Sequence, residues 1–218
     1  MAKLKIKPKA IIFDMDGVII DSMPYHFLAW YEALRPYGVR VSCFDVYAKE
    51  GEKWSKTLKD LLVQAGKKPT RKLLTAIFSR RQKIFRKLFQ RFIFSGAREL
   101  LASLKKQGYF LGLVTGSPRK EVAAILSAAI LRGFKVIVAG DEVSKGKPHP
   151  ESYLKAARLF DLAPAECLVV ENAPLGIEAA KNAGMFCVAI TTSLPKEYLQ
   201  KADIIVKKLQ EIPGLIKP

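Results

Sequence analysis

Residues 11–21 read IIFDMDGVIID, and this stretch decides how the chain folds. A short, wholly apolar run ends in Asp14, and Asp16 and Gly17 follow it directly. Such a run predicts a strand that is buried on both faces, as in a parallel sheet. Ligands of these sheets bind at the carboxyl ends of the strands, so we expect both carboxylates to face a binding crevice.

The chain repeats this pattern from residue 96 onward. Short apolar runs alternate with amphipathic stretches, which predicts an α/β fold with a parallel sheet covered by helices on both faces. The predicted strands are 9–14, 110–115, 135–140, 167–172, 186–191 and 203–207, and the helices among them are 96–108, 118–130, 150–160 and 174–184.

The segment from 22 to 93 differs because it contains no convincing strand. Its apolar residues recur at helical spacing, and they predict helices near 24–35, 43–49, 53–65 and 70–92. We therefore expect two domains. Residues 1–21 and 94–218 form the core, and residues 22–93 form a helical domain inserted after the first strand.

The composition excludes several classes of protein. The three cysteines, Cys43, Cys167 and Cys187, are far apart and form no Cys-x-x-Cys, which argues against a disulfide framework or a cysteine zinc site and favours a reducing cytoplasm. With only two histidines, a three-histidine zinc site is excluded. No apolar run reaches the roughly 18 residues of a membrane span, and the N-terminus lacks a secretory signal.

The positive charge is unevenly distributed. The 218 residues carry a net charge of +17, and residues 22–94 alone hold 16 basic against 5 acidic side chains. A basic surface of this kind binds nucleic acid, meets an acidic membrane, attracts small anions, or is simply solvated. The aromatic residues Phe78, Phe85 and Phe89 fall on the apolar stripe of the 70–92 helix, which weighs against nucleic-acid binding.

Polar side chains also end two other predicted strands. Thr115-Gly116-Ser117 offers hydroxyls and exposed amides that suit a phosphate, and Glu171-Asn172 offers two oxygen ligands. Lys147 precedes a proline at a helix start. Separately, each motif has an ordinary explanation as a helix cap or a polar turn. Together with the repelling pair Asp14 and Asp16, they predict a site with a divalent cation, and oxygen ligands suit Mg²⁺.

These motifs identify the chain as similar to the haloacid dehalogenase superfamily over essentially its whole length. Asp14-Met15-Asp16-Gly17-Val18 resembles the first motif, Thr115 the second, Lys147 the third and Glu171-Asn172 the fourth. The contexts GKPHPESY and ENAPLGIEAAKNAG are typical of the branch that contains β-phosphoglucomutase and phosphoglycolate phosphatase. The resemblance implies a Rossmann-like core with strand order 5-4-1-2-3 and a helical cap inserted after the first motif.

The resemblance also implies a mechanism, that of a Mg²⁺-dependent phosphatase acting on a small phosphate monoester. Asp14 would attack phosphorus to form an aspartyl-phosphate, and Asp16 would act as general acid and then general base. Mg²⁺ would be held by Asp14, the Asp16 carbonyl, Glu171 and Asn172. The side chains of Thr115 and Lys147 and the groups of Gly116 and Ser117 would stabilise the phosphoryl charge.

Asn172 departs from the family pattern, because the fourth motif usually ends in two acids. An asparagine ligates Mg²⁺ through its carbonyl oxygen but adds no charge, so we expect weaker Mg²⁺ binding than in a relative with two acids.

The cap sequence bears on the substrate. Residues 23–30, MPYHFLAW, resemble the start of the β-phosphoglucomutase cap, and His26 matches its histidine. The following loop reads Glu50-Gly51-Glu52-Lys53-Trp54. Where the mutase has a lysine and an arginine, this chain has Glu50 and Trp54, although Lys53 could replace them in part. A mutase must hold a second phosphate, so the loss of both cations favours a phosphatase.

Two alternatives stay open from the sequence. One is a β-phosphoglucomutase-like mutase, and the other is a non-catalytic protein of the same fold that binds anions or nucleic acid. We expect a monomer that acts on a small phosphorylated metabolite in the cytoplasm, without a membrane or a nucleic acid as partner.

Overall fold

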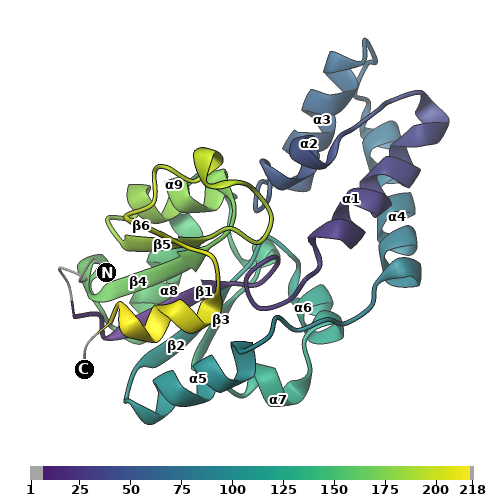
Figure 1. Ribbon diagram of the computed structural model, residues 1–218. Coiled ribbons are helices and arrows are strands. Elements are labelled where there is room, and N and C mark those ends of the chain that lie inside the picture. Colours follow the sequence, from purple (N-terminus) through teal and green to yellow (C-terminus); the bar gives the residue numbers. More distant parts are fainter. Residues whose placement is uncertain (1–6, 217–218) are drawn as a thin grey trace.

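A six-stranded parallel sheet forms the centre of the molecule, in a computed structural model that describes residues 7–216 (Figure 1). The strand order is β3-β2-β1-β4-β5-β6, so the expected order of the first five strands is confirmed and β6 extends the edge beyond β5. The strands are β1 (Ala10–Asp14), β2 (Phe110–Val114), β3 (Val136–Val138), β4 (Cys167–Glu171), β5 (Phe186–Ile190) and β6 (Ile204–Val206).

Helices cover both faces of this sheet, because alternate residues of each strand point to opposite sides. Ile11 and Phe13 of β1 pack with α5 (Ala97–Lys106), α6 (Arg119–Ile125) and α7 (Ala128–Leu131). Ala10 and Ile12 face the other way. They pack with α8 (Glu151–Phe160) and α9 (Pro174–Asn182). The all-apolar strands are thereby buried on both faces, as their sequences predict.

Residues 118–130 form two helices instead of the single one expected. Leu126 and Ser127 have extended backbones, and the Ser127 hydroxyl accepts a hydrogen bond from the Ile130 amide to begin α7. Arg91 then donates to the free carbonyls of Ala124 and Ile125 at the end of α6. These carbonyls lack helical partners at a helix end, so the arginine replaces the missing turn.

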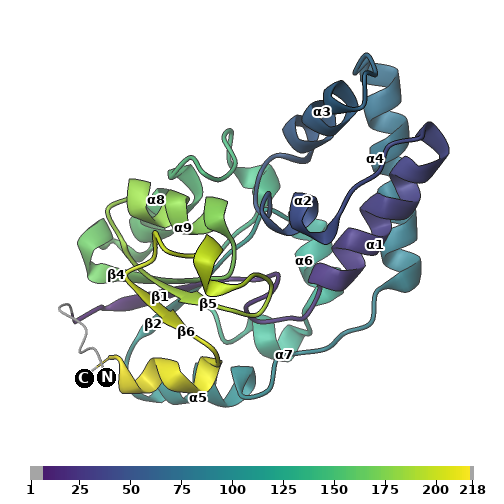
Figure 2. The same cartoon turned by 45° about the horizontal axis from the view of Figure 1, so that its top comes forward.

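Four helices lie together beyond the sheet, between β1 and α5 (Figures 1 and 2). They are α1 (Met23–Leu34), α2 (Cys43–Tyr47), α3 (Trp54–Gln64) and α4 (Arg71–Leu88). We call residues 22–93 the inserted segment. Its helices share a separate apolar cluster that includes Leu34, Leu58 and Ile77. Helix α4 ends four residues before the expected position, because Phe89 is extended.

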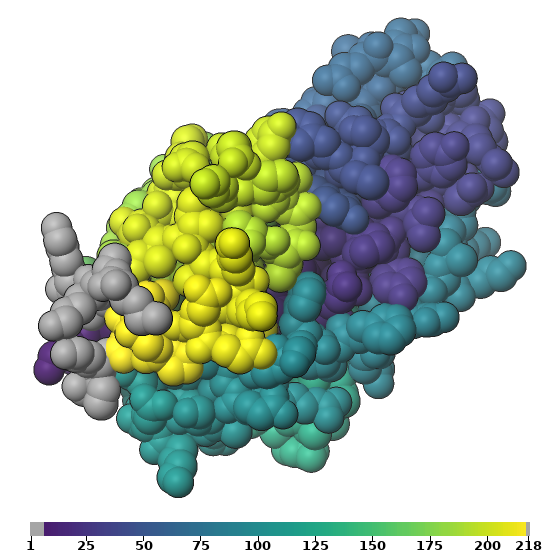
Figure 3. Space-filling model, in the orientation of Figure 1, coloured from purple at the N-terminus to yellow at the C-terminus, as the bar shows by residue number. Residues whose placement is uncertain are grey.

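The two crossings between the sheet and the inserted segment are hydrogen-bonded to each other. Ile20 and Ile93 form an antiparallel bridge, the Asp21 amide donates to the Phe92 carbonyl, and the Phe94 amide donates to the Ile19 carbonyl. In the space-filling view the inserted segment forms a second lobe against the core (Figure 3). Within the described part of the chain, no helix is both long enough and apolar enough to cross a membrane.

Candidate active site

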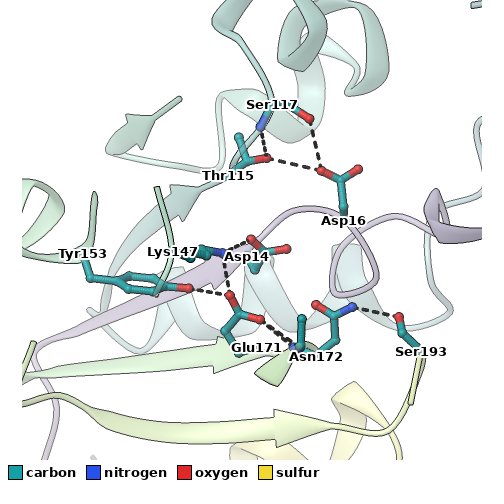
Figure 4. Close-up of polar contacts among 10 residues, drawn as sticks. Asp14, Asp16, Thr115, Ser117, Lys147, Tyr153, Glu171, Asn172 and Ser193 are labelled. Carbon is teal, nitrogen blue, oxygen red and sulfur yellow. Dashed lines mark hydrogen bonds and ion pairs between the residues drawn. The ribbon is translucent and has the colours of Figure 1, made fainter. Parts of the chain in front are cut away.

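The carboxyl ends of β1, β2 and β4 bring the predicted motifs together. Asp14 pairs in register with Val114 of β2, so Thr115 follows on one side of it, while Glu171 ends β4 on the other side. Asp14, Thr115, Lys147 and Glu171 are each no more than 3% exposed. Figure 4 shows these side chains gathered in one group above the strand ends.

Lys147 connects two of the carboxylates. Its Nζ lies 2.5 Å from Asp14 Oδ1 and 2.5 Å from Glu171 Oε1. Burial opposes the positive charge of Lys147, but Asp14 and Glu171 outweigh burial and raise the pKa of this lysine well above its ordinary value. Lys147 is therefore charged in the folded protein.

Glu171 is held by several donors. Its Oε1 accepts from the Tyr153 hydroxyl at 2.7 Å as well as from Lys147, and its Oε2 accepts from the amides of Asn172 and Ala173 at 2.8 and 3.1 Å. One oxygen thus holds Lys147 and Tyr153, the other binds the two amides just before α9, and the predicted contact of Glu171 with a metal stays a prediction.

The buried group carries more negative than positive charge. Burial raises the pKa of Asp14 well above its ordinary value, Glu171 and Asp16 raise it further, and Lys147 opposes them. One ammonium thus faces two adjacent carboxylates, and Asp16 lies close by. A cation would offset this repulsion.

Two buried oxygens meet the requirements of such a cation. Asp14 Oδ2 and Asn172 Oδ1 are buried and have no hydrogen-bond partner. Buried acceptors nearly always have a hydrogen-bond partner, so two oxygens without one at the same site need an explanation. Hard cations such as Mg²⁺ bind carboxylate and amide oxygens, and the residues present fit that ion. The described residues include no cluster of three or more His, Cys, Asp or Glu side chains arranged to hold a metal.

Asp16 is turned toward Thr115 and the inserted segment. Its Oδ1 accepts from the Ser22 hydroxyl at 2.5 Å and lies 3.0 Å from His26 Nε2, while its Oδ2 lies 3.3 Å from Thr115 Oγ1 and 3.4 Å from Ser117 Oγ. Burial raises the pKa of Asp16, but His26, with the hydroxyls of Ser22 and Thr115, outweighs burial. The pKa is lowered as a result.

Arg81 on α4 supports His26 from behind. Its guanidinium contacts His26 Nδ1, lies over the rings of Trp30 and Phe85, and is 3.9 Å from a Glu121 oxygen. With Nδ1 accepting from Arg81, the proton on the other ring nitrogen points to Asp16. A buried chain therefore links Arg81, His26 and Asp16.

Sequence reasoning missed Arg81, Ser22 and Tyr153. The many basic residues of 22–94 do not reveal which of them is buried, yet Arg81 lies four residues after Ile77 and four before Phe85, on the apolar stripe. That spacing is the signal that could have identified it. Ser22 and Tyr153 carry no comparable signal, because their partners Asp16 and Glu171 lie in other elements.

The predicted loop residues Gly51 and Lys53 lie against the core. The Gly51 carbonyl accepts from the Lys147 amide at 3.1 Å, and a Cβ on Gly116 would lie 3.0 Å from Gly51 Cα. Lys53 Nζ donates to the Gly140 and Val143 carbonyls at 2.7 Å each. Lys53 therefore binds core backbone rather than an open position for a phosphate.

A cavity of about 290 Å³ opens between this loop, α4 and the end of β2. Aromatic side chains form part of its wall, and the rings of Trp54 and Phe78 stack at 3.9 Å. His26, Gly116 and Ser117 also line it, so the cavity reaches the polar group around Asp16. The arrangement can hold an anionic group beside Asp14 and an attached carbon skeleton in the cavity.

A parallel α/β core with a buried acid pair, a lysine and hydroxyls at the strand ends is the arrangement of a hydrolase that acts at this edge of its sheet. The family model described as a haloacid dehalogenase-like hydrolase matches residues 8–184, and the chain belongs to this family. The family and the phosphatase class predicted from the sequence are confirmed.

Three relatives illustrate the similarity. Validoxylamine A 7'-phosphate phosphatase of Streptomyces hygroscopicus subsp. limoneus is 31% identical, over 94% of this chain and 95% of its own. Hexitol phosphatase A of Escherichia coli is 30% identical, over 96% and 95%. The structure of β-phosphoglucomutase from Clostridium difficile is 25% identical with a TM-score of 0.83, and the match covers 94% of this chain and 93% of that one.

Proposed function

We propose that this phosphatase requires Mg²⁺ and removes phosphate from a small metabolite with an uncharged, hydroxyl-bearing skeleton, such as a sugar or polyol phosphate. The observation that carries the proposal is the state of Asp14. One of its oxygens is held by Lys147, and the other is buried and unpaired beside Asn172. The names of the phosphatase relatives support the substrate class.

The chain's own residues account for both half-reactions. Asp14 attacks phosphorus, and the bond between phosphorus and the alcohol oxygen breaks while Asp16 gives that oxygen a proton. Asp16 then takes a proton from the water that attacks the aspartyl-phosphate, which releases phosphate and restores both carboxyls. When bound, Mg²⁺ would be held by Asp14 and Asn172 and would supply positive charge to the phosphoryl oxygens.

Asp16 must carry a proton for the first step, although His26 and its hydroxyl partners lower its pKa. A negatively charged phosphate raises the pKa of a carboxyl beside it. Substrate binding therefore favours the protonated form that the first step needs. Thr115 and Ser117, whose hydroxyls lie near Asp16 Oδ2, then orient the phosphoryl group between the two aspartates.

The cavity lining favours a substrate with one phosphate over a bisphosphate. Among the described residues that line it, each cation is already engaged: Lys49 with Asp60, Lys53 with two carbonyls, and Arg81 with His26. Trp54 stands at the position where the mutase has arginine. A second phosphate would find no available cation, whereas hydroxyl groups could donate to Glu50 and carbon–hydrogen faces could pack on Trp54.

We further propose that residues 22–93 act as the cap that closes over this cavity and that the enzyme works as a monomer in the cytoplasm. The separate apolar cluster of the inserted segment and its loop contacts with Lys147 support the first point. Three free cysteines suit a reducing compartment.

The test is a phosphate-release assay with and without Mg²⁺, across hexitol phosphates, hexose phosphates, phosphoglycolate and a hexose bisphosphate. We expect Mg²⁺-dependent release from the first two groups. We also expect the Asp14→Asn variant to lose activity by at least about 10³-fold while it keeps its circular dichroism spectrum, because covalent catalysis needs the carboxylate. Isomerisation without phosphate release would favour the mutase, and no turnover would contradict an enzyme.

A further inference from the structure

Asn172 is the one proposed metal ligand whose two polar ends differ chemically. Its Nδ2 donates to Ser193 Oγ at 2.8 Å, and its Oδ1 is buried without a partner. Figure 4 shows the oxygen on the side of Asp14 and the nitrogen on the side of Ser193. The contact with Ser193 therefore distinguishes the two ends of the amide.

The serine is itself held in place by the loop after β5. The Thr191 amide donates to the Val206 carbonyl, and the Thr192 hydroxyl donates to the Gly17 carbonyl. Gly17 has a φ of +81°, and a Cβ there would lie 2.1 Å from Asn172 Nδ2 and 2.7 Å from Ser193 Oγ. The glycine after the Asp14 and Asp16 turn thus leaves room for the contact between Asn172 and Ser193.

The orientation matters because an amide binds a cation only through its oxygen. An aspartate at this position would present an oxygen whichever way its carboxylate turned. An asparagine turned by half a rotation would point its NH₂ group toward Asp14, and an NH₂ group cannot bind the cation.

We propose that Ser193 is a positioning residue that fixes the Asn172 amide with its oxygen toward the cation site, and so makes an asparagine effective where relatives of this family usually have an acid. The proposal rests on the proposed Mg²⁺ site. Ser193 acts through Asn172 and has no direct contact with substrate in this assignment.

The experiment measures metal binding directly, without substrate. Mn²⁺ binding, followed by electron paramagnetic resonance, and Mg²⁺ titration calorimetry give the Kd for the wild type, Ser193→Ala, Asn172→Asp and the double variant. We expect Ser193→Ala to raise the Kd about tenfold, which is the lower end of the effect of outer ligand partners. In the Asn172→Asp background, the same serine change should alter the Kd less than twofold, because the carboxylate oxygens are equivalent.

The controls separate positioning from loss of structure. Ser193→Thr retains the hydroxyl and should restore the Kd to within about threefold of the wild type, and thermal unfolding reports whether each variant folds. If Ser193→Ala does not fold, Ser193→Gly replaces it in the same cycle.

The outcomes are distinct. Equal losses in both backgrounds, or an unchanged Kd in Ser193→Ala, would overturn the role of Ser193 while the Mg²⁺-dependent activity stands. A wild-type enzyme that releases phosphate equally well in a chelator, and binds neither metal, would overturn the proposed metal site and this inference with it.

Discussion

Lys147 carries the single positive charge between the buried carboxylates of Asp14 and Glu171. Removing one partner from a buried ionic group leaves the others uncompensated and costs about 3–5 kcal/mol of stability. This lysine therefore stabilises the fold, in addition to its proposed role at the phosphoryl group, and its effect on stability should depend on pH.

We expect Lys147→Met to lower the free energy of unfolding by about 3–5 kcal/mol at pH 8. The loss of stability should be smaller at pH 5. The pKa of Asp14 is raised in the folded wild type, and removal of Lys147, which opposes this rise, raises it further. A carboxyl with a raised folded pKa binds more protons when folded, so stability falls as pH rises. Urea unfolding at both pH values checks this, and a loss independent of pH would contradict it.

The residues predicted from the sequence are those whose position in the chain reveals their place in space. Asp14, Thr115 and Glu171 each end an apolar run, and the carboxyl ends of parallel strands meet at one edge. Ser22, Arg81 and Ser193 could not be found this way. Each gains its role from a partner in another element. Helical spacing places Arg81 on the apolar stripe of α4, but no pattern in the sequence names its partner or the partners of the two serines.

At the scale of the elements, α4 combines a solvated basic face with one buried arginine. Arg80 and Arg81 are adjacent in sequence, but Arg80 is exposed and Arg81 lies against Trp30 and Phe85. This adjacency offers a matched pair of substitutions.

We expect Arg81→Met to lower kcat at least about tenfold, because His26 loses the contact that orients it toward Asp16 and general acid–base catalysis contributes 10²–10⁴-fold. Arg80→Met should stay within about twofold, since surface substitutions have small effects. Steady-state kinetics on both variants, with circular dichroism as a folding control, make the comparison. Equal effects of the two changes would show that Arg81 has no special role.

The loop of residues 50–54 gives a second prediction at this scale, because Lys53 of the inserted segment donates to two carbonyls of the core. Lys53→Met should lower kcat/KM at least about tenfold, since hydrogen bonds from a charged donor are each worth about 1.5–3 kcal/mol and, in the proposed function, stabilise only the closed state of the cap.

Lys56 is the control for that prediction. It is exposed and pairs with Glu52 and Asp60, and such surface pairs contribute about 0–1 kcal/mol. Lys56→Met should therefore leave kcat/KM within about threefold. Wild-type kinetics in Lys53→Met would show that this lysine does not stabilise the closed state.

The elements themselves were predictable wherever pattern and caps agree. The apolar strands needed no tertiary information, whereas the break between α6 and α7 did. Residues 118–130 have helical periodicity throughout, but Ser127 begins a new helix and Arg91, far away in sequence, satisfies the carbonyls left by the break. Local helix propensity cannot reveal a partner that lies so far away in the sequence.

For the molecule as a whole, the net charge of +17 does not gather in the cavity. Acids and bases are nearly balanced among its described lining residues, with Lys49, Lys53 and Arg81 against Glu50, Glu52, Glu121 and Asp141. Much of the excess positive charge of the inserted segment lies on the exposed face of α4, on Arg71, Lys72, Arg80, Lys83, Arg86 and Lys87. Any attraction of phosphate anions therefore acts over distance.

Such attraction should depend on salt in a particular way. The screening length is about 30 Å at 0.01 M and about 10 Å at 0.1 M ionic strength. We expect kcat/KM to fall severalfold between these concentrations and to change little above 0.1 M, while kcat stays constant. A kcat/KM that is flat from 0.01 M upward would mean that the basic face is only solvated surface.

The paired crossings at Ile20 and Ile93 have a consequence for how such enzymes diversify. Residues opposite each other in an antiparallel pair lie about 4.5–5.5 Å apart, a distance that a tight turn can span. The core is therefore interrupted at a point where loops of very different length close at small entropic cost. A different helical segment with closely spaced ends could be grafted there without re-routing a strand, so evolution or a protein engineer could exchange substrate preference while retaining the chemistry.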